Sequence, residues 1–213
     1  MVAGFPRNAG GPAVSNSGGG DNSFVADEDY SAGGTTYAVT TPIVLPAGVT
    51  DAAPEAVYQD ARQGPITYTF PGLTAGTSYI VRLHFAELYF SAAGNRVFDV
   101  SINGTAVLTN FDIFAAAGAQ YTAMVEQFTA TPNSSGDLVI AFTSVTDQPM
   151  INGIEVFGAS TACSTVPSAP AGLAATATAG TRVAVPARVR EAVQPASIRL
   201  REWGVSRLPS EPP

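Results

Sequence analysis

The segment Phe85–Ile113 constrains the fold of this chain more than any other part of it. It contains the end of an alternating strand, a turn of small residues, a second alternating strand, an Asn-Gly pair and a third strand. Because Asn and Gly both tolerate positive φ, Asn103-Gly104 predicts a two-residue hairpin joining Val97–Ile102 to Thr105–Thr109. The segment therefore predicts antiparallel sheet.

Further short β segments follow one another between residues 37 and 157. Only Phe114–Gly118 predicts a helix, and one of about a single turn. Without helices between the strands, the pattern predicts an all-β fold, an antiparallel β-sandwich, and not βαβ units. The remaining predicted strands are Ile66–Phe70, Tyr79–Phe90, Tyr121–Thr131, Asp137–Thr143 and Ile151–Phe157.

The acidic body of the chain restricts its partners. Residues 1–180 hold 14 acidic residues and 4 Arg, a net charge of −10, whereas residues 181–213 hold 6 Arg and 3 Glu. Neutralising phosphates needs a basic surface, so we expect no nucleic-acid partner. No apolar run approaches the length of a bilayer span, so we expect no membrane insertion. We also expect a monomer without a cofactor or a metal.

The two ends of the chain lack the β pattern of its middle. The first residues lack the charged and apolar regions of a signal peptide, so either the protein is cytoplasmic or its start lies upstream. We expect the domain 1–158 to be followed by a Ser/Thr/Pro/Ala linker, 159–170, and a truncated or disordered Arg/Pro-rich tail, 171–213. Cys163, the single cysteine, falls in this linker and cannot form an internal disulfide.

Tyr89 and Phe90 are two large adjacent rings at the end of a predicted strand. Neighbouring side chains of a strand point to opposite faces, so both rings cannot enter one core if the strand continues through them. A turn of small residues, 91–94, follows directly. The pair therefore predicts a binding surface, although Phe90 in the core beside a half-exposed Tyr89 is the alternative.

Six segments, in order, resemble the malectin family of carbohydrate-binding domains. The resemblance implies a jelly-roll β-sandwich of the galactose-binding type that binds glucose-containing oligosaccharides or other glycans. Many bacterial members are modules of larger secreted or surface proteins, often beside fibronectin type III repeats, and Pro167–Thr178 resembles the opening of such a repeat. The six segments are Arg7–Ala13, Val57–Arg62, Leu83–Phe90, Arg96–Gly104, Asn110–Gly118 and Thr146–Phe157.

The family resemblance also implies the residues of a ligand site, which consists of aromatic rings and one Asp at one end of the sandwich. Tyr89 and Phe90 match the adjacent aromatic pair, Asp147 matches the Asp before the last strand, and Tyr37 matches a loop Tyr. Gln63 stands where the family has a further Tyr, so one stacking ring is replaced by an amide. This departure implies a changed affinity or sugar preference.

Three functions remain open from the sequence. The first is a non-catalytic module, extracellular or on the cell surface, that binds neutral glucan-type oligosaccharide or polysaccharide, because apolar pyranose faces pack on aromatic rings and hydroxyls bond to a carboxylate. The second is a protein-interaction or adhesion module whose sugar site is degraded, as Gln63 suggests. The third is a glycosidase that uses Glu87 and Asp99 as its carboxylate pair.

Several other polar residues have a structural interpretation and a functional one. Glu87 lies on the apolar phase of its strand and needs a partner, for which Arg82 and Arg96 are candidates. His84 is expected to be solvated or on a sheet face. The acidic residues Asp21, Asp27, Glu28 and Asp29 are expected to form a solvated loop, with a calcium site as the alternative. Asn103 and Asn133 begin glycosylation sequons.

Overall fold

The computed structural model describes residues 5–15, 23–31, 33–45 and 52–159. The chain divides into two units, Met1–Ser164 and Thr165–Pro213. The second unit lies outside the described residues, and so do the expected tail, Cys163 and the segment that resembles a fibronectin type III repeat. The expected linker lies outside them too, except for Ala159, so the domain boundary at residue 158 stays a prediction.

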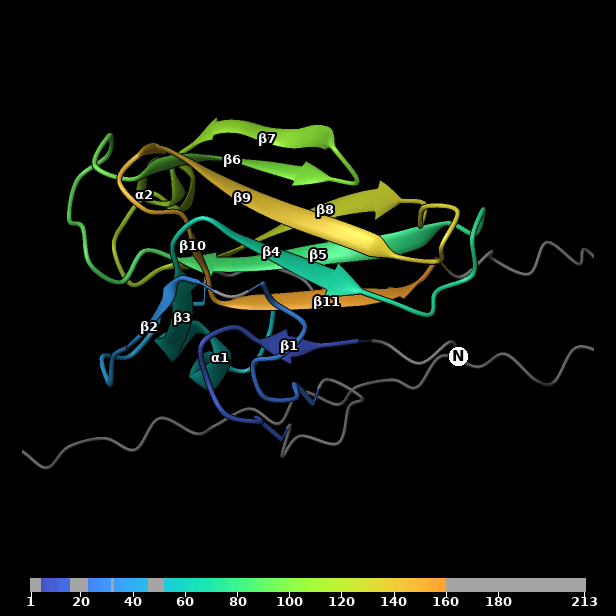
Figure 1. The fold of residues 1–213 in the computed structure, drawn as a ribbon. Coiled ribbons are helices and arrows are strands. Elements are labelled where there is room, and N and C mark those ends of the chain that lie inside the picture. Colours follow the sequence, from blue (N-terminus) through green and yellow to red (C-terminus); the bar gives the residue numbers. More distant parts are fainter. Residues whose placement is uncertain (1–4, 16–22, 32, 46–51, 160–213) are drawn as a thin grey trace, which may run out of the picture. The chain divides into compact units, whose positions relative to one another are not determined.

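Two four-stranded antiparallel sheets form a β-sandwich, which confirms the predicted fold class (Figure 1). In the first sheet the order is β1-β11-β5-β8, and in the second it is β4-β9-β6-β7. The first sheet consists of β1 (Arg7–Asn8), β11 (Gly153–Gly158), β5 (Tyr79–Ala86) and β8 (Ala123–Ala130). The second consists of β4 (Ile66–Phe70), β9 (Leu138–Thr146), β6 (Val97–Ile102) and β7 (Thr105–Phe111).

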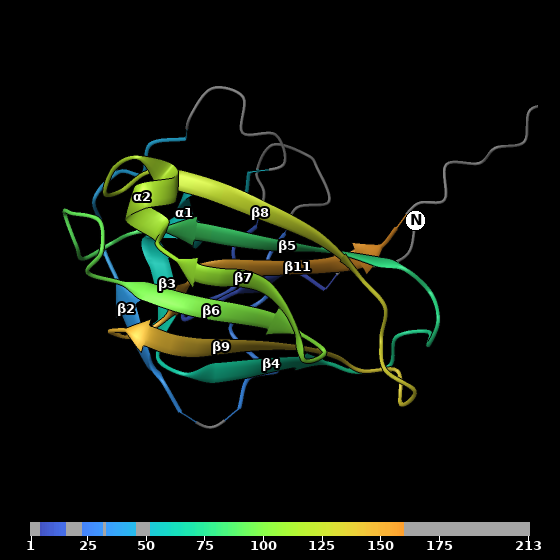
Figure 2. The ribbon, with the colours of Figure 1, turned by 90° about the horizontal axis from the view of Figure 1, so that it is seen from above.

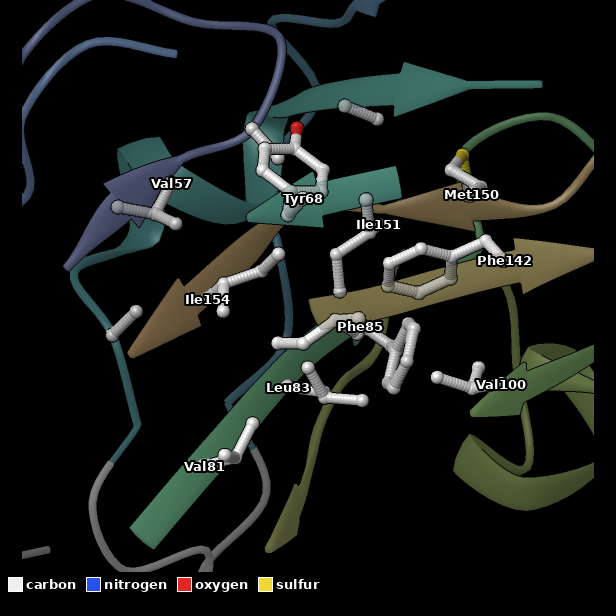
Figure 3. Close-up of a cluster of buried hydrophobic side chains, with 14 of the residues drawn as sticks. Val57, Tyr68, Val81, Leu83, Phe85, Val100, Phe142, Met150, Ile151 and Ile154 are labelled. Carbon is white, nitrogen blue, oxygen red and sulfur yellow. The ribbon is translucent and has the colours of Figure 1, made fainter. Parts of the chain in front are cut away.

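Side chains of both sheets meet in one hydrophobic core, part of which Figure 3 shows. Strands β4 and β6 alternate strictly between buried and half-buried residues, as expected for strands with one face inward. Phe85 of β5 contacts Phe98 of β6 across the sandwich, with ring centroids 6.0 Å apart. Phe98 in turn lies 6.4 Å from Phe142 of β9, so aromatic rings join the two layers.

A third, three-stranded sheet has the order β10-β3-β2. Its strands and the C-terminal ends of β5 and β9 lie at the same end of the molecule (Figure 2). The sequence pattern predicted neither β2 nor β3, and it did not predict the short helix α1 (Glu55–Gln59) directly before β3. This sheet consists of β2 (Thr35–Ala38), β3 (Asp60–Gln63) and β10 (Met150–Ile151).

The local signals in the segment Phe85–Ile113 predict its structure correctly except at its first strand. Asn103 and Gly104 have φ of +49° and +78° and join β6 to β7. The predicted one-turn helix is α2 (Ile113–Ala117), which begins after Asp112, whose carboxylate accepts a hydrogen bond from the Ala115 amide. Strand β5, however, ends at Ala86, so the predicted strand Tyr79–Phe90 is four residues too long.

Candidate functional site

Three of the five predicted site residues lie together at the end of the sandwich where the third sheet lies. The Tyr89 ring contacts Tyr37 of β2 edge-on, with centroids 6.2 Å apart. It also contacts Phe90, with centroids 5.0 Å apart and ring planes at 89°. Tyr89 is 61% exposed, and Tyr37 and Phe90 are half-buried, so the rings form a cluster at the surface, with Tyr37 packed against the core. We call Tyr37, Tyr89 and Phe90 the aromatic cluster.

Glu87 shapes the chain that carries two of these rings. One of its carboxylate oxygens, Oε1, accepts hydrogen bonds from the backbone amides of Tyr89, at 2.9 Å, and Phe90, at 3.0 Å. The backbone therefore leaves the strand after Ala86 and turns, which lets two adjacent side chains reach one surface. Two adjacent side chains of a strand would point to opposite faces, but Tyr89 and Phe90 lie beyond the end of β5 and are free of this restriction.

Of the two arginines that the sequence offered as partners of Glu87, the structure pairs Arg96 with it. Its Nε donates to Glu87 Oε2 at 2.7 Å, and its guanidinium lies over the Phe90 ring, 5.1 Å from the centroid. Its Nη1 also donates to the Gln148 carbonyl, next to Asp147. The other candidate, Arg82, instead lies 3.7 Å from the carboxylate of Glu155.

The two remaining predicted site residues flank the cluster in different ways. Gln63 pairs with Thr35 in the β2–β3 register, and Tyr37 pairs with Ala61, so Gln63 and Tyr37 share one face of the third sheet. Asp147 is exposed and has a φ of +57°. It follows β9, and its neighbour Gln148 accepts a hydrogen bond from Arg96, which lies over the Phe90 ring.

Sequence reasoning missed Gln120 as a residue of this site. Its Nε2 donates to the carbonyls of Leu88, at 3.3 Å, and Tyr89, at 3.0 Å. The next residue, Tyr121, has a φ of +55° and its amide donates to the Glu87 carbonyl at 2.9 Å. A glutamine more than thirty residues away carries no sequence signal that links it to the rings.

The carboxylates proposed for a glycosidase occupy separate structural positions. Glu87 is fully buried and follows a strand of the first sheet, and its oxygens are engaged as described. Asp99 belongs to β6 in the second sheet, where its Oδ1 accepts a hydrogen bond from the Asn110 amide at 2.7 Å. Each carboxylate therefore has a structural role in place.

His84 lies on the face of the first sheet opposite Leu83 and Phe85, as one of its two expected positions has it, but it is not solvated. Its side chain is fully buried, with Nδ1 3.0 Å from the Tyr58 hydroxyl and Nε2 3.0 Å from the Glu155 carboxylate. Polar partners on both sides make burial of the ring possible. Burial, opposed by a hydrogen bond from the Ala53 amide, raises the pKa of Tyr58 well above its usual value.

The expected solvated acidic loop is also corrected for two of its residues. Asp27 forms an ion pair with Arg62 and accepts a hydrogen bond from the Tyr68 hydroxyl at 2.8 Å, and Asp29 pairs with Arg7. Glu28 stays largely exposed, and Asp21 lies outside the described residues. Burial lowers the pKa of Arg62, but the bond to Asp27 and its charge outweigh this, so the pKa is raised.

The described residues set two further limits on the chemistry of the domain. Among them, His, Cys, Asp and Glu do not gather into a group of three or more that would hold a metal ion. None of their helices has both the length and the apolar character that a bilayer span requires. The cluster itself offers one largely exposed ring, that of Tyr89, beside the half-buried rings of Tyr37 and Phe90.

Curated relatives of this chain are plant and animal proteins. The chain is 36% identical over 111 residues to receptor-like protein 4 of Arabidopsis thaliana, and this match covers 49% of the chain and 18% of that protein. It is 30% identical over 155 residues to kinesin-like protein KIN-14E of Oryza sativa subsp. japonica, covering 69% of the chain and 14% of that protein. Over 66 residues it is 38% identical to malectin of Mus musculus, covering 30% of the chain and 22% of malectin. The chain thus spans less than a fifth of the first two relatives, and these matches give no support to a bacterial source or a neighbouring fibronectin type III repeat.

Solved structures share the fold. The ANX2 ectodomain from Arabidopsis thaliana has a TM-score of 0.66 at 23% identity, covering 72% of this chain and 49% of that one. A chain of the plant peptide RALF23 complex with FER and LLG2 has a TM-score of 0.67 at 25% identity, covering 74% and 49%. The malectin domain family itself matches residues 6–154. The chain therefore belongs to the malectin domain family.

Proposed function

We propose that this protein is a non-catalytic carbohydrate-binding module for neutral, glucan-type oligosaccharide or polysaccharide. The observation that carries the proposal is the aromatic cluster, with Tyr89 61% exposed and braced edge-on by Tyr37 and Phe90. A large ring left this exposed has the character of a sugar-stacking surface.

The role of each residue follows from its chemistry. The face of Tyr89 takes the apolar face of a pyranose ring, while Tyr37 and Phe90 fix the orientation of Tyr89. Asp147 and Gln63 bond to hydroxyls at the ring edge. A small, wet site of this kind gives affinities in roughly the micromolar to millimolar range. No charge is needed to attract the ligand, which fits an acidic protein.

Replacement of the central ring tests this proposal. Tyr89→Ala is expected to weaken oligosaccharide binding roughly 30-fold, which corresponds to about 2 kcal/mol, because the stacking face is lost. The wild type is first screened on a glycan array, and variants are then compared by affinity electrophoresis. Tyr30→Ala is the matched control, since Tyr30 is 38% exposed but contacts Tyr68 and Arg62, away from the cluster. Folded wild-type protein that no glycan retains would refute the proposal.

A second candidate function is a protein-interaction or adhesion module on the same fold. Its support is the solved complex of a plant peptide with FER and LLG2, one chain of which has this fold. The replacement of a stacking Tyr by Gln63 agrees with it. A protein partner whose capture survives both Tyr89→Ala and Phe90→Ala would favour this function over sugar binding.

We infer that the protein acts outside the cell and as part of a longer chain. The support is that its relatives include a receptor-like protein and its fold is that of a receptor ectodomain. We infer no hydrolytic activity, because Glu87 and Asp99 are each committed to structural hydrogen bonds. Measurable turnover of a glycoside that is lost in Glu87→Gln would contradict this.

A further inference from the structure

Beneath the exposed rings lies a buried ion pair. The Glu87 and Arg96 side chains are only 1% and 2% exposed. They nevertheless contact residues of the aromatic cluster, whose Tyr89 ring is open to solvent. Removing two charges from water costs several kcal/mol, so such a pair persists only where further hydrogen bonds satisfy both groups. Its other contacts therefore indicate what it is for.

The carboxylate of Glu87 bonds to the turn that carries two rings of the aromatic cluster and to Arg96. Its Oε1 holds the amides of Tyr89 and Phe90, while Oε2 receives Arg96 Nε. From the opposite side Gln120 holds the carbonyls of Leu88 and Tyr89. Two amides and two carbonyls of the turn are thus bonded to side chains, which fixes the backbone from which the two rings project.

The contacts of Arg96 extend beyond the cluster. Its guanidinium lies over the Phe90 ring and donates a hydrogen bond to the Gln148 carbonyl. This carbonyl is 52 residues further along the chain and belongs to the residue after Asp147. One guanidinium thus joins the turn with the rings to the loop with the acid.

We propose that Glu87 and Arg96 form the positioning pair of the binding site, which holds the aromatic cluster and the Asp147 loop in one fixed arrangement so that they engage a ligand as a unit. This inference rests on the proposed function for the ligand, and it adds two residues that do not touch the ligand. Arginine is required because its planar fork donates in two directions at once, to Glu87 and to Gln148. A lysine keeps the charge but lacks the planar fork that reaches both acceptors from separate nitrogens.

Arg96→Lys is the decisive variant, and Arg82→Lys is its matched control. Arg82 also lies over a ring, that of Phe157 at 4.6 Å, and also faces a carboxylate, that of Glu155. The first readout needs no ligand: hydrogen exchange of the Tyr89 and Phe90 amides is expected to become about tenfold faster in Arg96→Lys. In Arg82→Lys it is expected to stay at the wild-type rate.

The second readout is coupling between the two halves of the site. With maltotetraose and cellotetraose as probes, the effects of Tyr89→Ala and Asp147→Ala on binding are expected to be non-additive in the wild type and additive in the Arg96→Lys background. Arg96→Lys alone is expected to weaken binding about tenfold. Equal losses in Arg96→Lys and Arg82→Lys would overturn the inference, since they would reflect stability alone.

The two proposals fail in different ways. A wild type that binds no sugar, with amide exchange still accelerated in Arg96→Lys, removes the proposed function and leaves the pair as the element that orders the rings. Unchanged amide exchange in a folded Arg96→Lys overturns the pair and leaves sugar binding. If Arg96→Lys does not fold, hydrogen exchange in the wild type tests the inference instead. The Tyr89 and Phe90 amides are then expected to exchange as slowly as those of β5. Exchange at the rate of ordinary loop amides would overturn the inference.

Discussion

At the scale of single residues, buried polar side chains decide how the loops around the core are placed. Asn152 is fully buried between β10 and β11. Its Oδ1 accepts from the Ala86 amide at 2.7 Å, where β5 ends, and its Nδ2 donates to the carbonyls of Tyr58, at 3.0 Å, and Asp60, at 2.8 Å. One amide therefore ties β5, α1 and β3 together, which fixes the end of the sandwich that carries the aromatic cluster.

Asn152→Asp tests this role with almost no change in volume. The carboxylate still accepts from Ala86 but turns a second acceptor toward two carbonyl oxygens and places a charge in the core, so the free energy of unfolding is expected to fall by about 3 kcal/mol. Urea denaturation measures it. The control is Asn95→Asp, an exposed asparagine with a single bond to the Ala92 carbonyl, for which we expect little change. Similar losses at both positions would contradict the assignment.

At the scale of elements, the turn after β1 brings the start of the chain against β3. Gly10 has a φ of +82°, and a Cβ there would lie 2.1 Å from the Ala61 carbonyl oxygen. Its amide donates to Asp27 at 2.7 Å, and Asp27 pairs with Arg62 of β3. The glycine thus permits the approach that holds β3, the strand that carries Gln63.

Gly10→Ala is therefore expected to destabilise the protein far more than the same change at an open turn. Gly76 has a φ of +77°, and a Cβ there would meet nothing within 4 Å, so Gly76→Ala costs only the left-handed strain, about 1 kcal/mol. Gly10→Ala adds a backbone clash and is expected to cost about 3 kcal/mol or more. Thermal unfolding compares the two, and equal shifts in Tm would refute the close approach.

At the scale of the whole molecule, two tyrosine hydroxyls buried at its interior link folding to alkaline pH. Tyr58 bonds to His84, and Tyr68 donates to Asp27. Burial, chiefly, and the negative charge of Asp27 raise the pKa of Tyr68 well above its usual value, and burial does the same for Tyr58. Both hydroxyls stay protonated in the folded protein, while in the unfolded chain they lose their protons near pH 10.

Stability is consequently expected to be unaffected by these groups below pH 10 and to fall as pH rises above it. The unfolded state then binds fewer protons than the folded state, so each tyrosine lowers the free energy of unfolding by about 1.4 kcal/mol per pH unit. Urea denaturation at a series of alkaline pH values measures the slope. Tyr58→Phe is expected to halve the slope, and an unchanged slope would contradict the contribution of Tyr58.

Several strands and one hairpin were predictable because the signals for them lie in consecutive residues. Alternation located β5 and β6, and Asn103-Gly104 located a hairpin, since side-chain period and turn chemistry depend only on near neighbours. The adjacency of Tyr89 and Phe90 indicated a surface for the same reason. Tyr37, Gln63 and Asp147 were reached only by family resemblance, because nothing in their local sequence distinguishes them.

The sequence by itself determined the β-sandwich and the rings that leave it, because strand phase and turn residues are written in consecutive positions. Only the tertiary structure decided which polar groups are buried together. Glu87 had two candidate arginines and received Arg96, His84 proved to be buried, and Asp27 met Arg62 from 35 residues away. Such partners are chosen by the packing of layers, which satisfies each buried charge from whichever strand lies opposite, and no local pattern encodes that choice.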